Sequence, residues 1–379
     1  MKKVKLVNLF LYIRNGANIK QGMENTGYPI TRIETISNRK VDRNKMGYAG
    51  ITNLEKYSDY ILQDGDILMS HINSETHLGK VALYCKEDNE TIIHGMNLLL
   101  LRPKKDLIVS KYAFYYLSSQ SFLRQIPNIT KKSVNQASFT VTALKDLSIP
   151  MVSITEQKAI AERLDKVSGL IEKRKTQLEK LDLLIKSRFI ELFGDPVLNQ
   201  HGWRKAALEA NATLLNGRAY KQDELLDSGK YPVLRVGNFF SNRGWYYSDL
   251  ELDDEKYCDS GDLLYAWSAS FGPQIWNGGK VIYHYHIWKV LVGEAYNKQF
   301  LCKLLEYATE SLMRDTHGIA MMHLTKSGME KTEFIVPPIE LQEQFATFVE
   351  QTDKSKFEIQ KSLEKLEILK KSLMQQYFG

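Results

Sequence analysis

Cysteine is scarce in this sequence, since only Cys85, Cys258 and Cys302 occur among 379 residues. Their odd number and wide spacing exclude a disulfide framework and a CxxC metal site, and they indicate a reducing cytoplasm. Long apolar runs are also missing, because none approaches the ~18 residues that a membrane span needs. Residues 1–16 begin with basic side chains but lack a small-residue cleavage site, so we expect a first strand or helix there and not a signal peptide.

Signatures of catalysis are absent as well. The Gly-Lys pairs at 79–80, 229–230 and 279–280 are not followed by Ser or Thr, which excludes a phosphate-binding loop of the GxxxxGK[ST] type. No histidine precedes a glutamate, so an HExxH zinc site is excluded, and no GxSxG nucleophile elbow occurs. Carboxylates are numerous, but nothing singles out a catalytic pair. The sequence predicts no catalytic residue and no metal ligand, and it favours a binding and positioning protein.

Charge is unevenly distributed along the chain, whose overall net charge is +6. Residues 1–154 contain 21 basic and 13 acidic side chains, a net charge of +8. Residues 193–339 contain 15 basic and 18 acidic side chains, a net charge of −3, largely because of an acidic run at 249–259. The first part is therefore expected to bind a polyanion more readily than the third.

Two long segments, 155–192 and 340–377, each carry one apolar stripe in a charged sequence. Both contain Leu-Glu-Lys-Leu and both lead into Phe-Gly, at 193–194 and at 378–379. A stripe of this length cannot be buried by one helix alone, so we expect the two helices to pair as a coiled coil. Two independent helices on separate cores are the alternative. The predicted helix-pairing seam consists of Ile160, Leu164, Val167, Ile171, Leu178, Leu181, Ile185, Phe348, Ile359, Leu363, Leu366 and Leu373.

The same junction precedes both helices. Pro150 precedes the Glu-Gln pair at 156–157 by the same spacing as Pro337 precedes the pair at 343–344, so proline and pair recur at one constant offset. We interpret each proline as the end of a last strand, after which the helix begins.

The segments before each junction also correspond. Residues 27–37, 63–71 and 78–84 resemble 230–241, 259–268 and 278–285, and all six read as strands and turns. Residues 110–126 and 297–313 read as one amphipathic helix each.

The expected fold is α+β, with two similar globules of mixed or antiparallel β-sheet and flanking helices. Two long helices packed as an antiparallel coiled coil join the globules, which a tandem repeat would relate by a pseudo-twofold axis. The predicted boundaries are 1–149 for the first globule, 150–194 for the central helix, 195–336 for the second globule and 337–379 for the distal helix.

This tandem pattern, its Pro…Glu-Gln junctions and the Phe-Gly after each helix resemble the specificity (S, HsdS) subunits of Type I restriction–modification enzymes. The lead-in stretches 142–150 and 324–338 resemble that family too. The resemblance implies that each globule is a target recognition domain reading one half of a bipartite site in double-stranded DNA. It implies that the helices set the spacing and dock two methyltransferase (M) subunits, which bind S-adenosylmethionine and methylate adenine N6. Motor–nuclease (R) subunits would join for restriction, and this chain would be a non-catalytic subunit without a cofactor of its own.

Candidate DNA-binding residues in the first globule are polar and basic side chains on three predicted loops, at 37–45, 70–80 and 128–139. Solvated loops or polar hairpins are the alternative. The candidates are Asn38, Arg39, Lys40, Arg43, Asn44, Lys45, His71, Asn73, His77, Lys131, Lys132, Asn135 and Gln136.

Candidates in the second globule lie on loops that we align with those of the first. Residues 266–280 align with 70–80, 316–328 align with 130–142, and Arg218 aligns loosely with Arg14-Asn15-Gly16. An aromatic loop that only packs in the core is the alternative. The candidates are Arg218, Asn242, Arg243, Tyr246, Trp267, Ser268, Ser270, Gln274, His317, His323 and Lys326. Two explanations of the negative net charge of this globule stay open. Either the acidic run at 249–259 faces away from DNA, or this half-site binds weakly until the M subunits clamp the duplex.

Two other function classes stay open at this point. A scaffold with two ligand-binding globules would show no salt-dependent affinity for DNA, whereas a DNA-binding subunit would show a steep dependence. An unrecognised hydrolase with dispersed carboxylates would turn over substrate as an isolated chain.

Overall fold

A computed structural model describes residues 2–20, 25–37, 39–132, 136–241, 244–268, 270–315 and 325–379. The predicted DNA-contacting residues Asn38, Asn135, Asn242, Arg243, His317 and His323 lie outside these ranges. The chain divides into two compact units, and each is described by itself. The first unit comprises residues 1–175 and 361–379, and the second comprises residues 176–360.

A six-stranded mixed sheet forms the centre of the first unit. Its order is β2-β8-β5-β7-β4-β3, and only β7 and β4 run parallel. The sheet strands are β2 (Phe10–Asn15), β3 (Ile36–Ser37), β4 (Lys40–Val41), β5 (Ile67–Ser70), β7 (Val81–Leu83) and β8 (Leu98–Pro103). Around them lie β1 (Lys2–Lys5), α1 (Leu6–Leu9), β6 (Ile72–Asn73), α2 (Ser110–Leu117), α3 (Gln120–Leu123), α4 (Ile126–Ile129), β9 (Lys131–Lys132), β10 (Ala137–Ser138), α5 (Val141–Asp146) and β11 (Ser148–Met151).

The apolar run of β8 is explained by burial on both faces of this sheet. Leu99 and Leu101 face a core shared with α2, whereas Leu98 and Leu100 face a second core on the other side. The single helix predicted over 110–126 is wrong, because the chain breaks into α2, α3 and α4. Ser119 explains the break, since its side chain accepts a hydrogen bond from the Phe122 N–H and caps α3.

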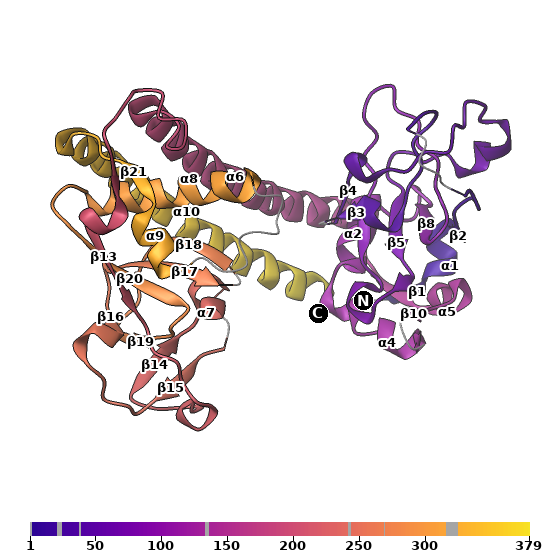
Figure 1. The fold of residues 1–379 in the computed structure, drawn as a ribbon. Helices are drawn as coiled ribbons and strands as arrows, with labels where there is room; N and C mark the ends of the chain where they lie inside the picture. Colours follow the sequence, from indigo (N-terminus) through magenta and orange to yellow (C-terminus); the bar gives the residue numbers. More distant parts are fainter. Residues whose placement is uncertain are drawn as a thin grey trace. The chain divides into compact units, whose positions relative to one another are not determined.

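The second unit contains two four-stranded sheets, β13-β20-β17-β18 and β15-β14-β19-β16. Their strands are β13 (Ala212–Asn216), β14 (Tyr231–Leu234), β15 (Tyr246–Ser248), β16 (Tyr257–Cys258), β17 (Leu263–Ser268), β18 (Ser270–Ile275), β19 (Val281–Tyr283) and β20 (Ile287–Val292). The other elements are β12 (Lys205–Ala207), α7 (Val236–Ser241), α8 (Lys298–Asp315), α9 (Lys326–Lys331) and β21 (Glu333–Ile335). The helix predicted over 297–313 is confirmed as α8, which covers one face of the first of these sheets (Figure 1).

The two units repeat one topology, but one predicted alignment is wrong. Ile30 pairs in parallel with Ile93 in the first unit, as Val233 does with Ile282 in the second, so residues 27–37 do correspond to 230–241. The counterpart of β19 is therefore the segment around Ile93, and not residues 78–84. Strand β7 in 78–84 instead corresponds to β18, because β7 pairs antiparallel with β5 and lies next to β5 in the order β8-β5-β7, as β18 pairs with β17 in the order β20-β17-β18.

Two glycines mark the same bend in both units. A Cβ on Gly16 would lie 2.0 Å from the Gly95 carbonyl oxygen, and one on Gly217 would lie 2.4 Å from the His284 carbonyl oxygen. Only glycine allows the backbones to approach this closely. Since Gly217 matches Gly16, Arg218 corresponds to Ala17 and not to the Arg14-Asn15-Gly16 stretch as a whole.

Helices α6 (Ile154–Phe193) and α10 (Ile339–Phe378) both contain 40 residues. The fourth residue of each helix is a completely buried glutamine, Gln157 in α6 and Gln342 in α10. The Gln157 Oε1 atom accepts from the Val109 N–H at 2.9 Å, and the Gln342 Oε1 atom accepts from the Asn297 N–H at 2.9 Å. The register predicted from the Glu-Gln pairs is therefore wrong by two, since Gln157 matches Gln342 and not Gln344.

The prolines of the two junctions are not equivalent either. Pro150 lies inside β11, which pairs with β1, whereas Pro337 follows β21, which pairs with β12. The LEKL and Phe-Gly motifs recur at the same offset as the two buried glutamines, so these motifs mark the true repeat.

Within each unit, one half of α6 packs antiparallel to one half of α10. In the first unit the Arg163 Nη1 atom donates to the Tyr377 hydroxyl at 3.1 Å, and the Lys175 Nζ atom lies 3.6 Å from Glu367. In the second unit the Lys356 Nζ atom lies 2.5 Å from Asp182. Every residue of the predicted helix-pairing seam is buried or half-buried.

Each unit is completed by the last aromatic residue of one long helix. Phe378 of α10 packs in the first unit with ring centroids 5.3 Å from Tyr112 and 5.7 Å from Tyr116, both on α2. Phe193 of α6 packs in the second unit, 4.6 Å from Phe300 of α8. Leu6 and Phe378 share one core, and Figure 1 shows both chain ends in the first unit. Among the described residues, no helix combines the length and apolar character needed to cross a membrane.

Candidate nucleic-acid interface

A groove of about 620 Å³ in the first unit combines two of the predicted DNA-contacting segments. Arg39 and Lys45 come from the segment at 37–45, and Asn73 and His77 come from the segment at 70–80. Lys80, which the sequence prediction omitted from its candidates, lines the groove as well. One glutamate, Glu34, accompanies these cationic side chains. The groove therefore suits an anionic ligand and also offers an amide that can read a base edge.

The third predicted segment lies beside the second in a small sheet of order β6-β10-β9. Ala137 pairs with Asn73 on one side and with Lys132 on the other, so these predicted residues lie on neighbouring strands. Lys131, Lys132 and Gln136 are exposed, and the Lys132 Nζ atom lies 2.9 Å from Glu75.

Several other candidates in the first unit are engaged within the unit itself. The Arg43 guanidinium donates two hydrogen bonds to the Glu90 carboxylate, both at 2.7 Å, which lowers the pKa of Glu90 to about 2. The Lys40 Nζ atom donates to Glu172 at 2.9 Å. His71 is only 5% exposed, and burial lowers its pKa to about 4, so it is neutral at neutral pH. Asn44 is exposed beside Arg43.

In the second unit, the predicted aromatic loop becomes a hairpin of β17 and β18. Trp267 stacks on Trp288 with centroids 5.7 Å apart, and its Nε1–H donates to the Tyr285 carbonyl at 2.8 Å. Ser268 and Ser270 pair with each other at the hairpin end. Trp267 therefore packs against other aromatic rings, which is the alternative that we gave for this loop. Ser268 and Ser270 lie at the tip of the hairpin.

Three further candidates of the second unit are placed on different elements. The Arg218 guanidinium forms a two-bond ion pair with Glu224, at 2.7 and 2.8 Å. The Arg235 guanidinium lies over the ring of Tyr246, 5.2 Å from its centroid. Lys326 begins α9 and lies 3.5 Å from Glu330.

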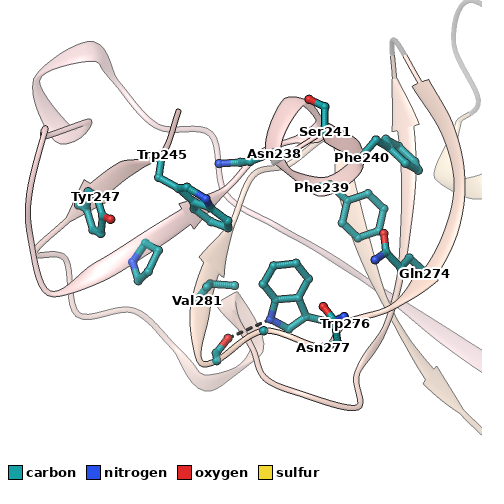
Figure 2. Close-up of a pocket in the computed structure, with 13 residues that line it drawn as sticks. Asn238, Phe239, Phe240, Ser241, Trp245, Tyr247, Gln274, Trp276, Asn277 and Val281 are labelled. Atoms are coloured by element: carbon teal, nitrogen blue, oxygen red, sulfur yellow. Dashed lines mark hydrogen bonds between the residues drawn. The ribbon is translucent and has the colours of Figure 1, made fainter. Parts of the chain in front are cut away.

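Gln274 lines an aromatic pocket of about 630 Å³ (Figure 2). Trp276 stands in this pocket between Trp245 on one side and Phe239 and Gln274 on the other (Figure 2). The Trp276 Nε1–H donates to the Gly279 carbonyl at 2.9 Å, which fixes the indole ring. Asn277 adds a second amide. Rigid rings next to amide groups can stack on a planar ring and hydrogen-bond to its edge.

A second pocket of about 320 Å³ was not predicted from the sequence; Arg235, His284 and His286 line it. Burial, followed by the neighbouring His286 and Arg235, lowers the pKa of His284 to about 4. The signal for this pocket lies in the strand pairing and not in the sequence alone. Arg235 and His284 directly follow the parallel strands β14 and β19, and the carboxyl ends of parallel strands meet at one sheet edge, where ligands often bind.

Groups of three or more His, Cys, Asp or Glu side chains able to hold a metal ion are not found in the described part of the chain. The geometry is that of two related surfaces with cationic, amide and aromatic groups. Whether the predicted residues contact DNA stays a prediction.

Known proteins share this organisation. The family model described as the Type I restriction modification DNA specificity domain matches residues 1–181 and again residues 201–370. The putative type I restriction enzyme MjaX specificity subunit of Methanocaldococcus jannaschii is 32% identical over 394 residues, which cover 98% of this chain and 91% of that protein.

Two solved structures share the fold. The S subunit of a Type-I restriction-modification system from M. genitalium aligns with a TM-score of 0.61 and 17% identity, over 100% of this chain and 96% of its own. A chain from a structural study of complex assembly and conformational transition in the type I R-M system aligns with a TM-score of 0.55 and 15% identity, over 100% and 97%. Since the family model matches both halves of the sequence and the relative from Methanocaldococcus jannaschii covers nearly all of it, the chain belongs to the family of type I restriction enzyme specificity subunits.

Proposed function

We propose that this chain is the DNA-recognition subunit of a type I restriction–modification complex and that each unit reads one half of a bipartite site. The observation that carries the proposal is the repeat itself. The two units share the order of four sheet strands, the glycine bend and the buried glutamine near the helix start, yet different side chains occupy the equivalent loops. Two different half-sites require the same backbone framework in both units but different side chains on the surfaces that face DNA.

The long helices supply the spacing in this proposal. At ~1.5 Å per residue, a helix of 40 residues is about 60 Å long. Half-sites on one face of B-DNA lie ~34 Å apart, about one turn. A continuous helix of this length can span that separation and still be anchored in the core of each unit.

Exposed apolar side chains on the helices support docking of two methyltransferase subunits. In the first unit Ile368 is 69% exposed, and in the second unit Leu183 and Phe357 are 63% and 65% exposed. Where such side chains form a contiguous patch, they mark a contact with another protein. The partner methyltransferase subunits would bind S-adenosylmethionine and methylate adenine N6, and motor–nuclease subunits would join them for restriction. This chain would contribute recognition and no catalytic group.

The test is a base-resolution methylation map of the source cell's genome, with and without the gene for this chain. The expected result is the loss of N6-methyladenine at one motif with two short half-sites and a spacer of fixed length. A second strain with Lys45→Ala and His77→Ala should show reduced methylation at that motif, because both side chains line the groove. Identical maps with and without the gene, while the methyltransferase subunits are present, would refute the proposal.

A further inference from the structure

A cluster of five cationic side chains in the first unit lies beside the groove of about 620 Å³, named the recognition groove from here on, and shares Arg39 with it. Arg39 comes from the turn between β3 and β4, Lys40 begins β4, Lys175 comes from α6, and Lys370 and Lys371 come from α10. Together they line a pocket of about 490 Å³. We name these five residues the helix cationic cluster.

The carboxylates of this pocket do not neutralise the helix cationic cluster. Glu172 and Glu367 are the carboxylates that line it in the described part of the chain. Each lies near one lysine, with Glu172 2.9 Å from Lys40 and Glu367 3.6 Å from Lys175. Among the residues that the structure describes, Arg39, Lys370 and Lys371 have no carboxylate within ion-pair distance. The cluster thus keeps an excess of positive charge.

The half-buried position of Lys370 among other cations makes this excess charge costly. Burial lowers the pKa of Lys370, and the nearby cations Arg39 and Lys175 lower it further, although Glu172 opposes them. Burial also lowers the pKa of Arg39. Cations held close together and partly removed from water are stabilised when an anion binds between them.

Arg39 connects the helix cationic cluster to the recognition groove, since it lines both. Its backbone has φ of 63°, in the left-handed region that arginine rarely adopts. The turn therefore holds this side chain where the two surfaces meet. Positive charge continues from Lys80 and Lys45 in the groove, through Arg39, to the lysines on the helices.

We propose that the helix cationic cluster binds backbone phosphates of the unread spacer DNA next to the half-site of the first unit. This inference rests on the proposed function. Lysine is suited to such a contact, because it is a flexible point charge that meets phosphates without reading bases. The long helix would then hold the spacer DNA as well as set its length.

The contact would be one-sided, because the second unit replaces two of the three helix lysines. The repeat places Gln360 at the position of Lys175, and Ile185 at the position of Lys370. Ile185 is buried in the core of the second unit.

The third helix lysine of the cluster does have a counterpart, Lys186, at the position of Lys371. The Lys186 Nζ atom lies over the ring of Tyr307, 5.2 Å from its centroid, within the second unit. A single lysine held by an aromatic ring does not reproduce the cluster, so we expect no equivalent phosphate contact next to the second half-site.

The experiment uses the complex of this chain with its methyltransferase subunits and DNA that carries the methylated motif. Lys370→Ala combined with Lys371→Ala removes two cations of the cluster. Lys361→Ala combined with Lys365→Ala is the matched control, because both lysines are exposed on α10 and lie outside the pocket. DNA affinity is measured over a range of salt concentrations, and phosphate-ethylation interference locates the contacts.

The cluster variant should reduce the slope of log affinity against log salt by about 1.8, since each lost phosphate contact contributes ~0.9. Interference should vanish at spacer phosphates beside the first half-site only, with motif preference unchanged. Lys370→Arg with Lys371→Arg should restore the slope, and the control should match the wild type.

Three outcomes separate the possibilities. An unchanged slope with unchanged interference, while the motif is still methylated, overturns this inference and leaves the proposed function intact. Loss of methyltransferase subunits from the complex with an unchanged slope shows that the cluster binds protein, and it also overturns the inference. If the wild-type complex methylates no bipartite motif, the proposed function fails first and the inference fails with it.

Discussion

Replacing Gln342 by alanine tests the helix junction directly. The Gln342 side chain is completely buried and makes three hydrogen bonds to backbone groups. Its Oε1 accepts from the Asn297 N–H at 2.9 Å, and its Nε2 donates to the carbonyls of Ala295 at 3.0 Å and Pro337 at 2.8 Å. These groups belong to the segment before α8 and to the segment before α10, so one amide ties both together.

The magnitude follows from those three bonds. A neutral hydrogen bond contributes about 1 kcal/mol net, so their loss should destabilise the second unit by about 3 kcal/mol. At about 1.4 kcal/mol per tenfold, this is roughly 100-fold faster opening of the start of α8. Hydrogen exchange measured by mass spectrometry on peptides that cover α8 gives the readout.

Gln344→Ala is the matched control. Gln344 is exposed on the same helical turn, and the repeated Glu-Gln motif would make it the partner of Gln157. Its replacement should change stability by less than about 0.5 kcal/mol. Equal exchange rates in the two variants would show that the register of the repeat and the role of the buried amide have been misjudged.

Three further predictions concern the first unit. Phe378→Ala should destabilise it by about 3–5 kcal/mol, because a large ring packed on Tyr112 is removed, and exchange should accelerate in α2 but not in α8. Burial lowers the pKa of His94 to about 3, so stability should fall as pH drops below ~6.5, where only the unfolded form gains a proton. Between pH 6.5 and 5 the wild type should lose about 1.6 kcal/mol more than His94→Gln in urea unfolding, and equal losses would contradict this. Lys131→Ala combined with Lys132→Ala should weaken binding of the complex to all DNA sequences and reduce the slope of log affinity against log salt. An unchanged slope would show that neither lysine contacts DNA.

The long helices could be predicted from the sequence because their pattern is local and repeated. The apolar stripe has the helical period, and the LEKL and Phe-Gly motifs carry the true repeat. The buried or half-buried seam residues lie where the stripe places them.

The register of the junction could not be obtained in this way. The proline and the Glu-Gln pair recur at an offset that differs by two residues from that of the buried glutamines. Which glutamine is buried depends on hydrogen bonds to backbone groups outside the helix, and Gln157 makes three of them. Sequence similarity between residues 78–84 and 278–285 was misleading for the same reason, since strand pairing decides equivalence. Tertiary contacts of this kind leave no local pattern.

Only part of the candidate interface could be predicted. Loop composition identified Arg39, Lys45, Asn73 and His77, which the fold brings into one groove. Composition could not show that Arg43 is held by Glu90, because that glutamate lies 47 residues away. The pocket with Arg235 and His284 depends on which strands run parallel, and sequence alone does not fix that.

The division of α10 between the two units has a consequence for how the protein is made. The second unit is one uninterrupted stretch, residues 176–360, whereas the first unit also needs residues 361–379. A ribosome produces that last stretch only after all of the second unit has been synthesised. The first unit can therefore be completed only after the second unit has been synthesised, whereas N-terminal domains usually fold first during translation. Until Phe378 emerges, Tyr112 and Tyr116 of the first unit lack their aromatic partner, so the nascent chain carries an open apolar face that chaperones can bind.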